Sequence, residues 1–278
     1  MPDTRPRISF IGFGEAGQAI AAGLHDEGVE RMAAWDILFP HSAGERLGQA
    51  AAPIGVRCAT SAADAVRNAD IVISAVTAAS SVEAAQSIKP HLAGTPYVLD
   101  INSVSPRRKQ QTAKLLGDTA RYVDVAVLAP IYPARHKTPM LLAGAEIGAA
   151  AAIKMVRSVM IKGIEALTLE CFLAAARAGV IDEVASSMKN NYPGLDWAKI
   201  VPYNLERMAS HGERRAAEME EVADTLRELG VEPLMTTATV KRQREMGQIG
   251  TQQPVRAVLK EDRVAMLRAI SAAARDRH

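Results

Sequence analysis

Three glycines near the N-terminus have the spacing of a turn that binds a pyrophosphate. Gly12, Gly14 and Gly17 follow a short apolar run and precede a stretch of helix-forming residues. A pyrophosphate must approach backbone N–H groups at the start of a helix, where unpaired donors and the helix dipole favour an anion. The first glycine permits the tight turn, the second the close approach of the ligand, and the third the packing of helix on strand. The segment predicted to bind a dinucleotide is Gly12, Phe13, Gly14, Glu15, Ala16 and Gly17.

An acidic residue stands where the second strand of such a motif should end, 19 residues after the last glycine. A carboxylate at Asp36 would accept hydrogen bonds from the adenosine ribose hydroxyls and repel a 2′-phosphate. Residues 37–40 supply no arginine to bind such a phosphate. The pattern therefore favours NAD, with NADP as the open alternative. The other interpretation of Asp36 is that it caps the following turn.

The elements around this motif alternate between strand and helix. Strands are predicted over 8–11, 32–36, 56–58, 71–76, 97–101 and 122–127. The run 71–76 is continuously apolar, which is typical of a parallel strand covered on both faces. A doubly wound sheet binds its ligand at the carboxyl ends of its strands. Further cofactor contacts are therefore predicted at Ala75, Val76, Thr77, Asn102 and Ser103.

The pattern changes near residue 150, after which helices are predicted over 149–177, 206–229 and 261–275. The fold class is therefore α/β: an N-terminal Rossmann domain with a doubly wound parallel sheet over 1–148, and an all-helical domain over 149–278, joined by a long helix. Alanine fills much of the 48% hydrophobic content and aromatics only 4%, which also favours packed helices. The two cysteines lie far apart and form neither a disulfide framework nor a metal motif, so no metal is expected.

Charge and hydropathy exclude other classes of protein. Among 278 residues, 33 basic and 31 acidic side chains give a net charge of +2, and no basic block suggests a nucleic-acid partner. The longest run without Asp, Glu, Lys or Arg, 71–82, is too short to span a bilayer. The N-terminus does not have the pattern of a signal peptide. We expect a cytoplasmic protein with a small-molecule substrate.

Four segments in the same order resemble the β-hydroxyacid dehydrogenase superfamily, which includes 6-phosphogluconate and 3-hydroxyisobutyrate dehydrogenases. They are IGFGEAG at 11–17, DINSVSP at 100–106, VDVAV at 123–127 and KMV at 154–156. Two further segments, YPGLDW at 192–197 and HGERRAAEM at 211–219, resemble the 6-phosphogluconate-dehydrogenase-like branch that has its own C-terminal domain. The resemblance spans nearly the whole chain.

The resemblance implies a catalytic lysine. In this superfamily a lysine on the first long helix after the nucleotide domain removes the hydroxyl proton as hydride leaves for nicotinamide, and Lys154 occupies that place. It follows Gly148, Ala149 and Ala150, which are similar to the family's Gly-x-Gly. Burial beside a cofactor lowers the pKa of a lysine toward the range of a useful base. The implied activity is the NAD(P)-dependent oxidation of a 3-hydroxy acid, or the reverse reduction.

The chain departs from the family pattern at the substrate. The family's carboxylate-binding Ser-Gly-Gly is replaced by Leu128, Ala129 and Pro130, and its asparagine one turn after the lysine is Ser158. Lys162 lies on the same helical stripe, so it is either an alternative base or an anchor for an anion. The segment 142–148 is also shorter than in the family, which usually has another helix and strand there.

The helical half offers further candidates for binding and assembly. His211 and Arg214 have the chemistry to bind a substrate carboxylate or phosphate. Apolar residues lie on several faces of the predicted helix 149–177, and the relatives use this half to bury surface between subunits. We therefore expect a homodimer formed through the helical half.

Two other functions fit the same residues. An imine reductase shares the scaffold and would explain the loss of Ser-Gly-Gly, although Lys154 keeps the hydroxyacid type of base. A dinucleotide-binding sensor without catalysis is the alternative outside enzymes, because a fold does not fix a function.

Overall fold

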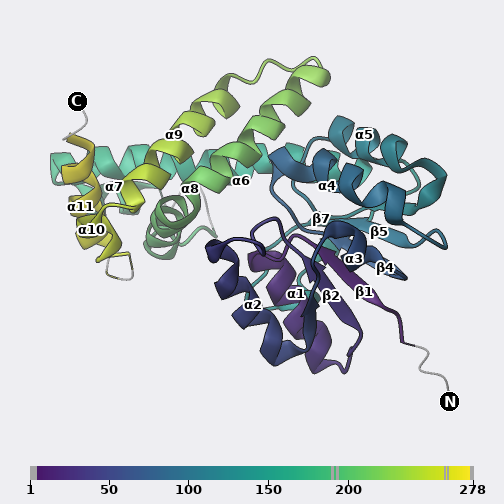
Figure 1. Cartoon of the computed structure of the whole chain (residues 1–278). Helices are drawn as coiled ribbons and strands as arrows, with labels where there is room; N and C mark the ends of the chain where they lie inside the picture. The colour runs from purple at the N-terminus through teal and green to yellow at the C-terminus, as the bar shows by residue number, and fades with distance from the viewer. Residues whose placement is uncertain (1–4, 189–190, 192–193, 260, 262, 276–278) are drawn as a thin grey trace. The chain divides into compact units, whose positions relative to one another are not determined.

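The computed structural model describes residues 5–188, 191, 194–259, 261 and 263–275 (Figure 1). Tyr192 and Pro193, which belong to one of the segments that carry the resemblance, lie outside the described residues. The chain divides into two compact units, Met1–Met155 and Val156–His278. The division falls inside helix α6 (Ala149–Ala178), a few residues beyond the boundary predicted at residue 148.

The N-terminal unit is built on six parallel strands in the order β3-β2-β1-β4-β5-β6, which confirms the doubly wound sheet. The strands are β1 (Ile8–Ile11), β2 (Met32–Trp35), β3 (Val56–Cys58), β4 (Ile71–Ser74), β5 (Tyr97–Asp100) and β6 (Arg121–Asp124). The helices between them are α1 (Glu15–Asp26), α2 (Glu45–Ala51), α3 (Ala62–Val66), α4 (Ser81–Ile88) and α5 (Pro106–Leu116).

Helices bury both faces of this sheet, which explains the apolar runs of its strands. On one face Phe10 belongs to a core cluster with Ile20 of α1 and Leu47 of α2. On the other, Ile11 belongs to a cluster with Leu116 of α5. Phe10 and Ile11 are neighbours in the chain and point to opposite faces, as the pleat requires. Figure 1 shows α1 and α2 on one side of the strands and α4 and α5 on the other.

The sixth strand, predicted over 122–127, is shorter in the structure than predicted. Strand β6 ends at Asp124, and β7 (Ala126–Val127) pairs antiparallel with β8 (Met140–Leu141) in a separate two-stranded sheet. The largely apolar run 122–127, interrupted only by Asp124, predicts a buried strand but does not reveal a change of sheet. The short segment 142–148 contains neither helix nor strand. Its Ile147 carbonyl accepts a hydrogen bond from Gln110 Nε2 at 3.1 Å.

The C-terminal unit is helical, as predicted. After α6 come α7 (Ile181–Ser187), α8 (Trp197–Glu228), α9 (Leu234–Gly250), α10 (Gln253–Arg256) and α11 (Arg263–Arg275). Its core joins Phe172 of α6, Leu205 of α8 and Met246 of α9. Helices α8 and α9 form a hairpin (Figure 1) and cross closely, because a Cβ at Gly212 would lie 2.2 Å from the Gln243 carbonyl oxygen.

Helix α8 begins at Trp197, nine residues before the predicted start at Glu206. Proline usually ends a helix because it lacks an N–H and clashes with the preceding turn, yet Pro202 lies inside α8. The Asp196 carboxylate caps the helix by accepting the Ala198 N–H at 3.1 Å. Full burial of Val201 also favours the longer helix. The last helix begins at Arg263 rather than at residue 261.

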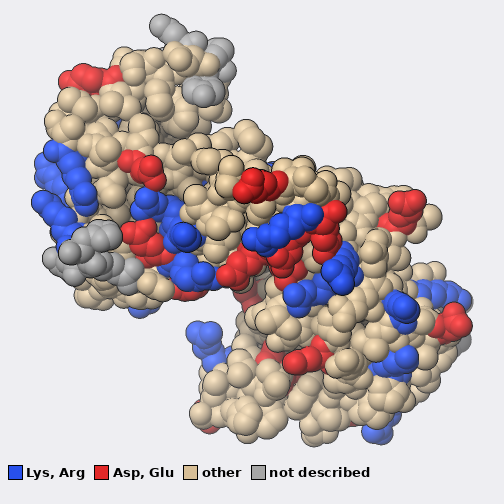
Figure 2. All heavy atoms as spheres, turned by 90° about the horizontal axis from the view of Figure 1, so that it is seen from above, with Lys and Arg blue, Asp and Glu red and all other residues tan. Residues whose placement is uncertain are grey.

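Acidic and basic side chains lie close to one another on the face drawn in Figure 2. Ion pairs between helices of the C-terminal unit include Arg242 with Glu170 at 2.8 Å and Arg244 with Glu220 at 2.6 Å. Within the described ranges, no helix is long and apolar enough to cross a membrane.

Candidate functional site

The glycine turn between β1 and α1 has the geometry that dinucleotide binding requires. Gly12 has a φ of +90°, and a Cβ there would lie 2.4 Å from the Ala75 carbonyl oxygen. A Cβ at Gly17 would lie 2.6 Å from the Gly12 carbonyl oxygen, so this glycine permits the packing of α1. A Cβ at Gly14 would meet no atom within 4 Å. The space over Gly14 is therefore open to a ligand, and the residues present fit a pyrophosphate.

The other residues of the turn contribute in different ways. The Phe13 side chain is fully buried and contacts Phe10 edge-on, with ring centroids 6.2 Å apart. Phe13 therefore anchors the turn in the core of the N-terminal unit. Glu15 is exposed in the first turn of α1, and Ala16 is half-buried.

Asp36 lies half-buried just after β2 and holds the turn together. Its Oδ2 accepts the Phe13 N–H at 2.7 Å, and its Oδ1 accepts the Leu38 N–H at 3.0 Å. The carboxylate thus caps the following turn, as the alternative interpretation holds. Each oxygen still has acceptor capacity for a ribose hydroxyl, so the two interpretations are compatible.

The ends of β4 and β5 are tied together by Asn102. Its Oδ1 accepts the Val76 N–H at 2.7 Å, and its Nδ2 donates to Ser74 Oγ at 2.9 Å. Because Asn102 is buried and both ends of its amide are engaged, its side chain positions the strand ends. Ser103 is half-buried and Thr77 is exposed, so these two hydroxyls lie nearer the surface.

Lys154 lies half-buried in the second turn of α6. Its Nζ donates a hydrogen bond to Ser103 Oγ. The start of α6 is fixed by Asp124, whose Oδ2 accepts the Gly148 N–H at 3.0 Å and the Ala151 N–H at 3.2 Å. The fold therefore brings the predicted base to the carboxyl end of β5.

A buried charged cluster behind this contact escaped the sequence analysis. Lys109 of α5 is 1% exposed, and its Nζ lies 2.9 Å from Asp100 Oδ1 and 3.5 Å from Asp124 Oδ1. Tyr122 donates to Asp100 Oδ2 at 2.8 Å, and burial together with this carboxylate holds the pKa of Tyr122 well above its ordinary value. One signal was available, because Asp100 and Asp124 end neighbouring strands. Lys109 gave no such signal, because it follows two arginines and has the sequence context of an exposed residue.

The residues that replace Ser-Gly-Gly offer no comparable set of donors. The Leu128 N–H donates to the Pro139 carbonyl oxygen at 3.0 Å. Ala129 and Pro130 are exposed. A proline has no N–H, so this turn does not supply the small donors of the family pattern.

In the helical unit, two candidate anchors share one carboxylate. Buried Lys162 has its Nζ 3.0 Å from Glu218 Oε2 and 3.3 Å from Ser158 Oγ. Exposed Arg214 lies 3.4 Å from Glu218 Oε1. His211 is half-buried on the same helix. Glu218 therefore already balances much of the positive charge that would attract a substrate anion.

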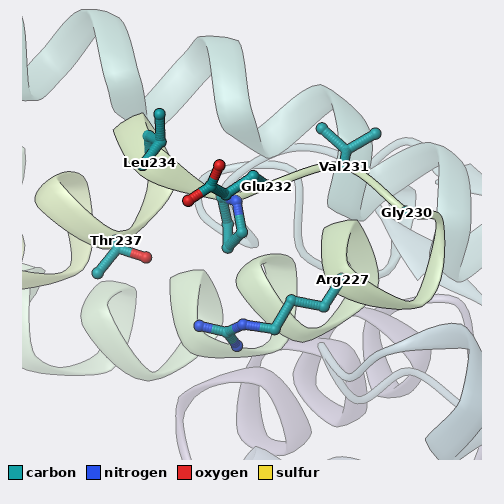
Figure 3. Close-up of a pocket in the computed structure, with 7 residues that line it drawn as sticks. Arg227, Gly230, Val231, Glu232, Leu234 and Thr237 are labelled. Atoms are coloured by element: carbon teal, nitrogen blue, oxygen red, sulfur yellow. The ribbon is translucent and has the colours of Figure 1, made fainter.

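A separate hollow of about 500 Å³ lies at the turn between α8 and α9 (Figure 3). Arg227 extends into it from α8, and Thr237 faces it from α9. Arg227 also pairs with Asp224 at 2.7 Å. None of the predicted substrate residues lines this hollow. Among the residues that the structure describes, no group of three His, Cys, Asp or Glu side chains could hold a metal ion.

Comparisons with known proteins agree with the two-part architecture. Residues 7–103 match the family model described as "NADP oxidoreductase coenzyme F420-dependent", and residues 175–246 match a domain of unknown function, DUF1932. A conserved hypothetical protein from Sinorhizobium meliloti is 34% identical, with 96% of each chain covered and a TM-score of 0.71.

Two further solved structures extend the comparison. A conserved protein of unknown function, described as structurally similar to 3-hydroxyacid dehydrogenases, is 29% identical over 87% of this chain and 97% of that one, with a TM-score of 0.66. The 3-hydroxyisobutyrate dehydrogenase of Mycobacterium tuberculosis is 14% identical, covers 97% of this chain and 99% of its own, and has a TM-score of 0.71. At that identity the likeness shows the fold alone.

Proposed function

The chain belongs to the 6-phosphogluconate and 3-hydroxyacid dehydrogenase-like family with an NAD(P)-binding N-terminal domain and a DUF1932 C-terminal domain, and we propose on that basis that it is an NAD(P)-dependent oxidoreductase. The proposed reaction moves a hydride between nicotinamide and a 3-hydroxy acid or its keto form. The observation that carries the proposal is the hydrogen bond from Lys154 Nζ to Ser103 Oγ, which lies at the sheet edge where a doubly wound fold binds its ligand.

The chain's own residues supply binding and proton transfer. A bound dinucleotide would supply the hydride acceptor or donor. Its pyrophosphate is proposed to lie over Gly14, where the backbone leaves open space. Neutral Lys154 accepts the substrate hydroxyl proton during oxidation and returns it during reduction. Ser103 keeps the amine at the end of β5, so little reorientation is needed when substrate arrives.

We propose NAD as the preferred cofactor. The support is Asp36, whose two oxygens retain acceptor capacity beside the glycine turn and whose charge opposes a 2′-phosphate. The description of the matched family model names NADP, so the direct comparison of NADH with NADPH decides this point.

The test is turnover, followed by cofactor fluorescence, against a panel of 3-hydroxy acids and cyclic imines. Lys154→Ala should lower turnover ~10²–10⁴-fold through lost proton transfer, with cofactor affinity nearly unchanged. Lys162→Ala is the matched comparison on the same helix, about 12 Å further along its axis. If Lys162 anchors substrate, its loss should chiefly raise the substrate concentration required. A dead Lys162 variant beside an active Lys154 variant would reverse the assignment.

One observation favours a second candidate, an imine reductase. The turn at Leu128, Ala129 and Pro130 provides no set of small donors for a substrate carboxylate, and an imine needs none. Turnover of cyclic imines without turnover of hydroxy acids would select this reaction. Tight cofactor binding without turnover on any substrate would instead select the sensor.

We further propose that the chain forms a homodimer through α6. Val156, Met160, Ile164 and Leu167, here called the α6 stripe, follow one another at spacings of four, four and three residues. Their side chains are between 37% and 64% exposed. Apolar residues at this spacing form a continuous seam on one side of a helix, and such seams pair with other helices.

A further inference from the structure

Lys109 is one of the most buried charged residues of the N-terminal unit. Its Nζ donates to the Asp100 carbonyl oxygen at 2.5 Å and to Asp100 Oδ1 at 2.9 Å. The same Nζ also forms an ion pair with Asp124 Oδ1 at 3.5 Å. A lysine is rarely buried to this degree unless it is paired. The two carboxylates that pair with it belong to neighbouring strands, β5 and β6.

Each carboxylate holds a different partner of the Lys154 contact. Asp100 Oδ1 also accepts the Asn102 N–H at 2.9 Å, which fixes the backbone immediately before Ser103. Asp124 Oδ2 accepts the Ala151 N–H at 3.2 Å, less than one helical turn before Lys154. The segments that carry the donor and the acceptor of the Lys154–Ser103 hydrogen bond are therefore both linked to the Lys109 ammonium group, one through Asp124 and the other through Asp100.

The two carboxylates of the cluster depend on the positive charge of Lys109. Asp124 Oδ1 is buried and accepts no hydrogen bond within the described part of the chain, and it forms an ion pair with the Lys109 ammonium at 3.5 Å. Without that charge, Asp100 and Asp124 would be two buried carboxylates that repel each other across adjacent strand ends. Relief of that repulsion would move the start of α6 away from the end of β5.

We propose that Lys109 is a positioning residue that holds the start of α6, and with it Lys154, against Ser103. This inference rests on the proposed role of Lys154 as the base. It assigns to Lys109 no contact with substrate or cofactor. Its effect on chemistry passes through the Asp100 and Asp124 carboxylates.

The test measures the chemical reactivity of the Lys154 amine and needs no substrate. Competitive acetylation with acetic anhydride, followed by peptide mass spectrometry, gives the modification rate of Lys154 against pH, with exposed Lys114 of α5 as internal reference. Lys109→Met removes the charge but keeps the volume of the side chain. Arg107→Met, which removes an exposed charge from the same helix, is the matched control. Thermal unfolding of each variant reports any general loss of stability.

In Lys109→Met the acetylation of Lys154 should accelerate about tenfold relative to Lys114, which corresponds to the loss of one hydrogen bond. Arg107→Met should leave the ratio unchanged. If Lys109→Met does not fold, Asp124→Asn replaces it, because the amide oxygen can still cap α6 while the attraction to Lys109 is lost. The same acceleration is expected there.

An unchanged Lys154 rate in a folded variant with a lowered melting temperature would overturn the proposal and leave Lys109 a purely structural role. The proposed function fails separately, through absence of turnover in the parent protein, and that result does not alter the labelling rates. Where turnover is measurable, Lys109→Met should lower kcat and leave the KM for cofactor unchanged, whereas general destabilisation would reduce the amount of active protein without this split.

Discussion

Replacing Asp36 by asparagine should weaken NADH binding and strengthen NADPH binding. The carboxylate accepts the Phe13 N–H at 2.7 Å and the Leu38 N–H at 3.0 Å, and each oxygen retains capacity for one ribose hydroxyl. Asparagine keeps one oxygen, so at least one charge-assisted hydrogen bond to the ribose is lost. Such a bond contributes about 1.5–3 kcal/mol, which corresponds to a roughly 10- to 150-fold increase in the Kd for NADH.

The opposite effect is expected for NADPH. A carboxylate and a phosphate charge about 4 Å apart repel by about 4 kcal/mol at an effective dielectric constant near 20, and Asp36→Asn removes that repulsion. The loss of one backbone partner should lower the free energy of unfolding by about 1 kcal/mol.

Nucleotide fluorescence titrations with NADH and NADPH measure the two Kd values, and Asp118→Asn, at an exposed position, is the control. Equal weakening of both nucleotides, or a parent protein that prefers NADPH, would refute the assignment of Asp36 to the ribose.

Three further predictions concern stability and assembly. Gly12→Ala should lower the free energy of unfolding by about 2–4 kcal/mol in denaturant titrations, because φ is +90° and the new Cβ would lie 2.4 Å from the Ala75 carbonyl oxygen. Arg7 lowers the pKa of Asp70 to about 2, so the stability from this exposed pair should be present above pH 4 and be lost as pH falls through 2. Asp70→Asn should therefore cost at most about 1 kcal/mol at pH 7 and progressively less as pH falls through 2. Leu167→Glu, within the α6 stripe, should convert a dimer to a monomer in sedimentation velocity, and a monomeric parent at micromolar concentration would contradict the proposed interface.

The sheet and the glycine turn were predictable because local sequence determines both. The central strands β1 and β4 are short, largely apolar runs, and both faces of the sheet are covered, so the run itself carries the signal. Gly17 is required by a contact with Gly12, and Gly12 by its positive φ and by a contact with Ala75, just after the neighbouring strand β4 of the sheet. The position of Asp36 beside the turn was predicted from the number of residues between it and the last glycine. The strands and the glycine turn depend on backbone geometry, and the backbone geometry of a residue is restricted directly by its type.

The errors arose where tertiary packing overrides a local rule. Pro202 predicts the end of a helix, yet burial of Val201 and the cap from Asp196 favour a helix that runs through it. Strand β6 stops at Asp124 because the following residues pair with a distant segment, β8, which no local pattern in the apolar run indicates. In both cases the bounds of the element depend on contacts between residues that lie far apart in the sequence. A local hydrophobic pattern contains no information on such contacts.

In the candidate catalytic site, too, local sequence does not predict which charged side chains contact one another. Lys154 was predictable from its place in a family pattern, but its hydrogen bond to Ser103 depends on the relative placement of α6 and β5. That placement is fixed by Asp124 capping the start of α6 and by Lys109 pairing with the same carboxylate. A lysine in a basic run on an amphipathic helix has the sequence of a solvated residue, and only the fold turns it toward two buried carboxylates. Residue type and spacing therefore propose candidates for chemistry, whereas the residues that position them are identified by which strands end side by side.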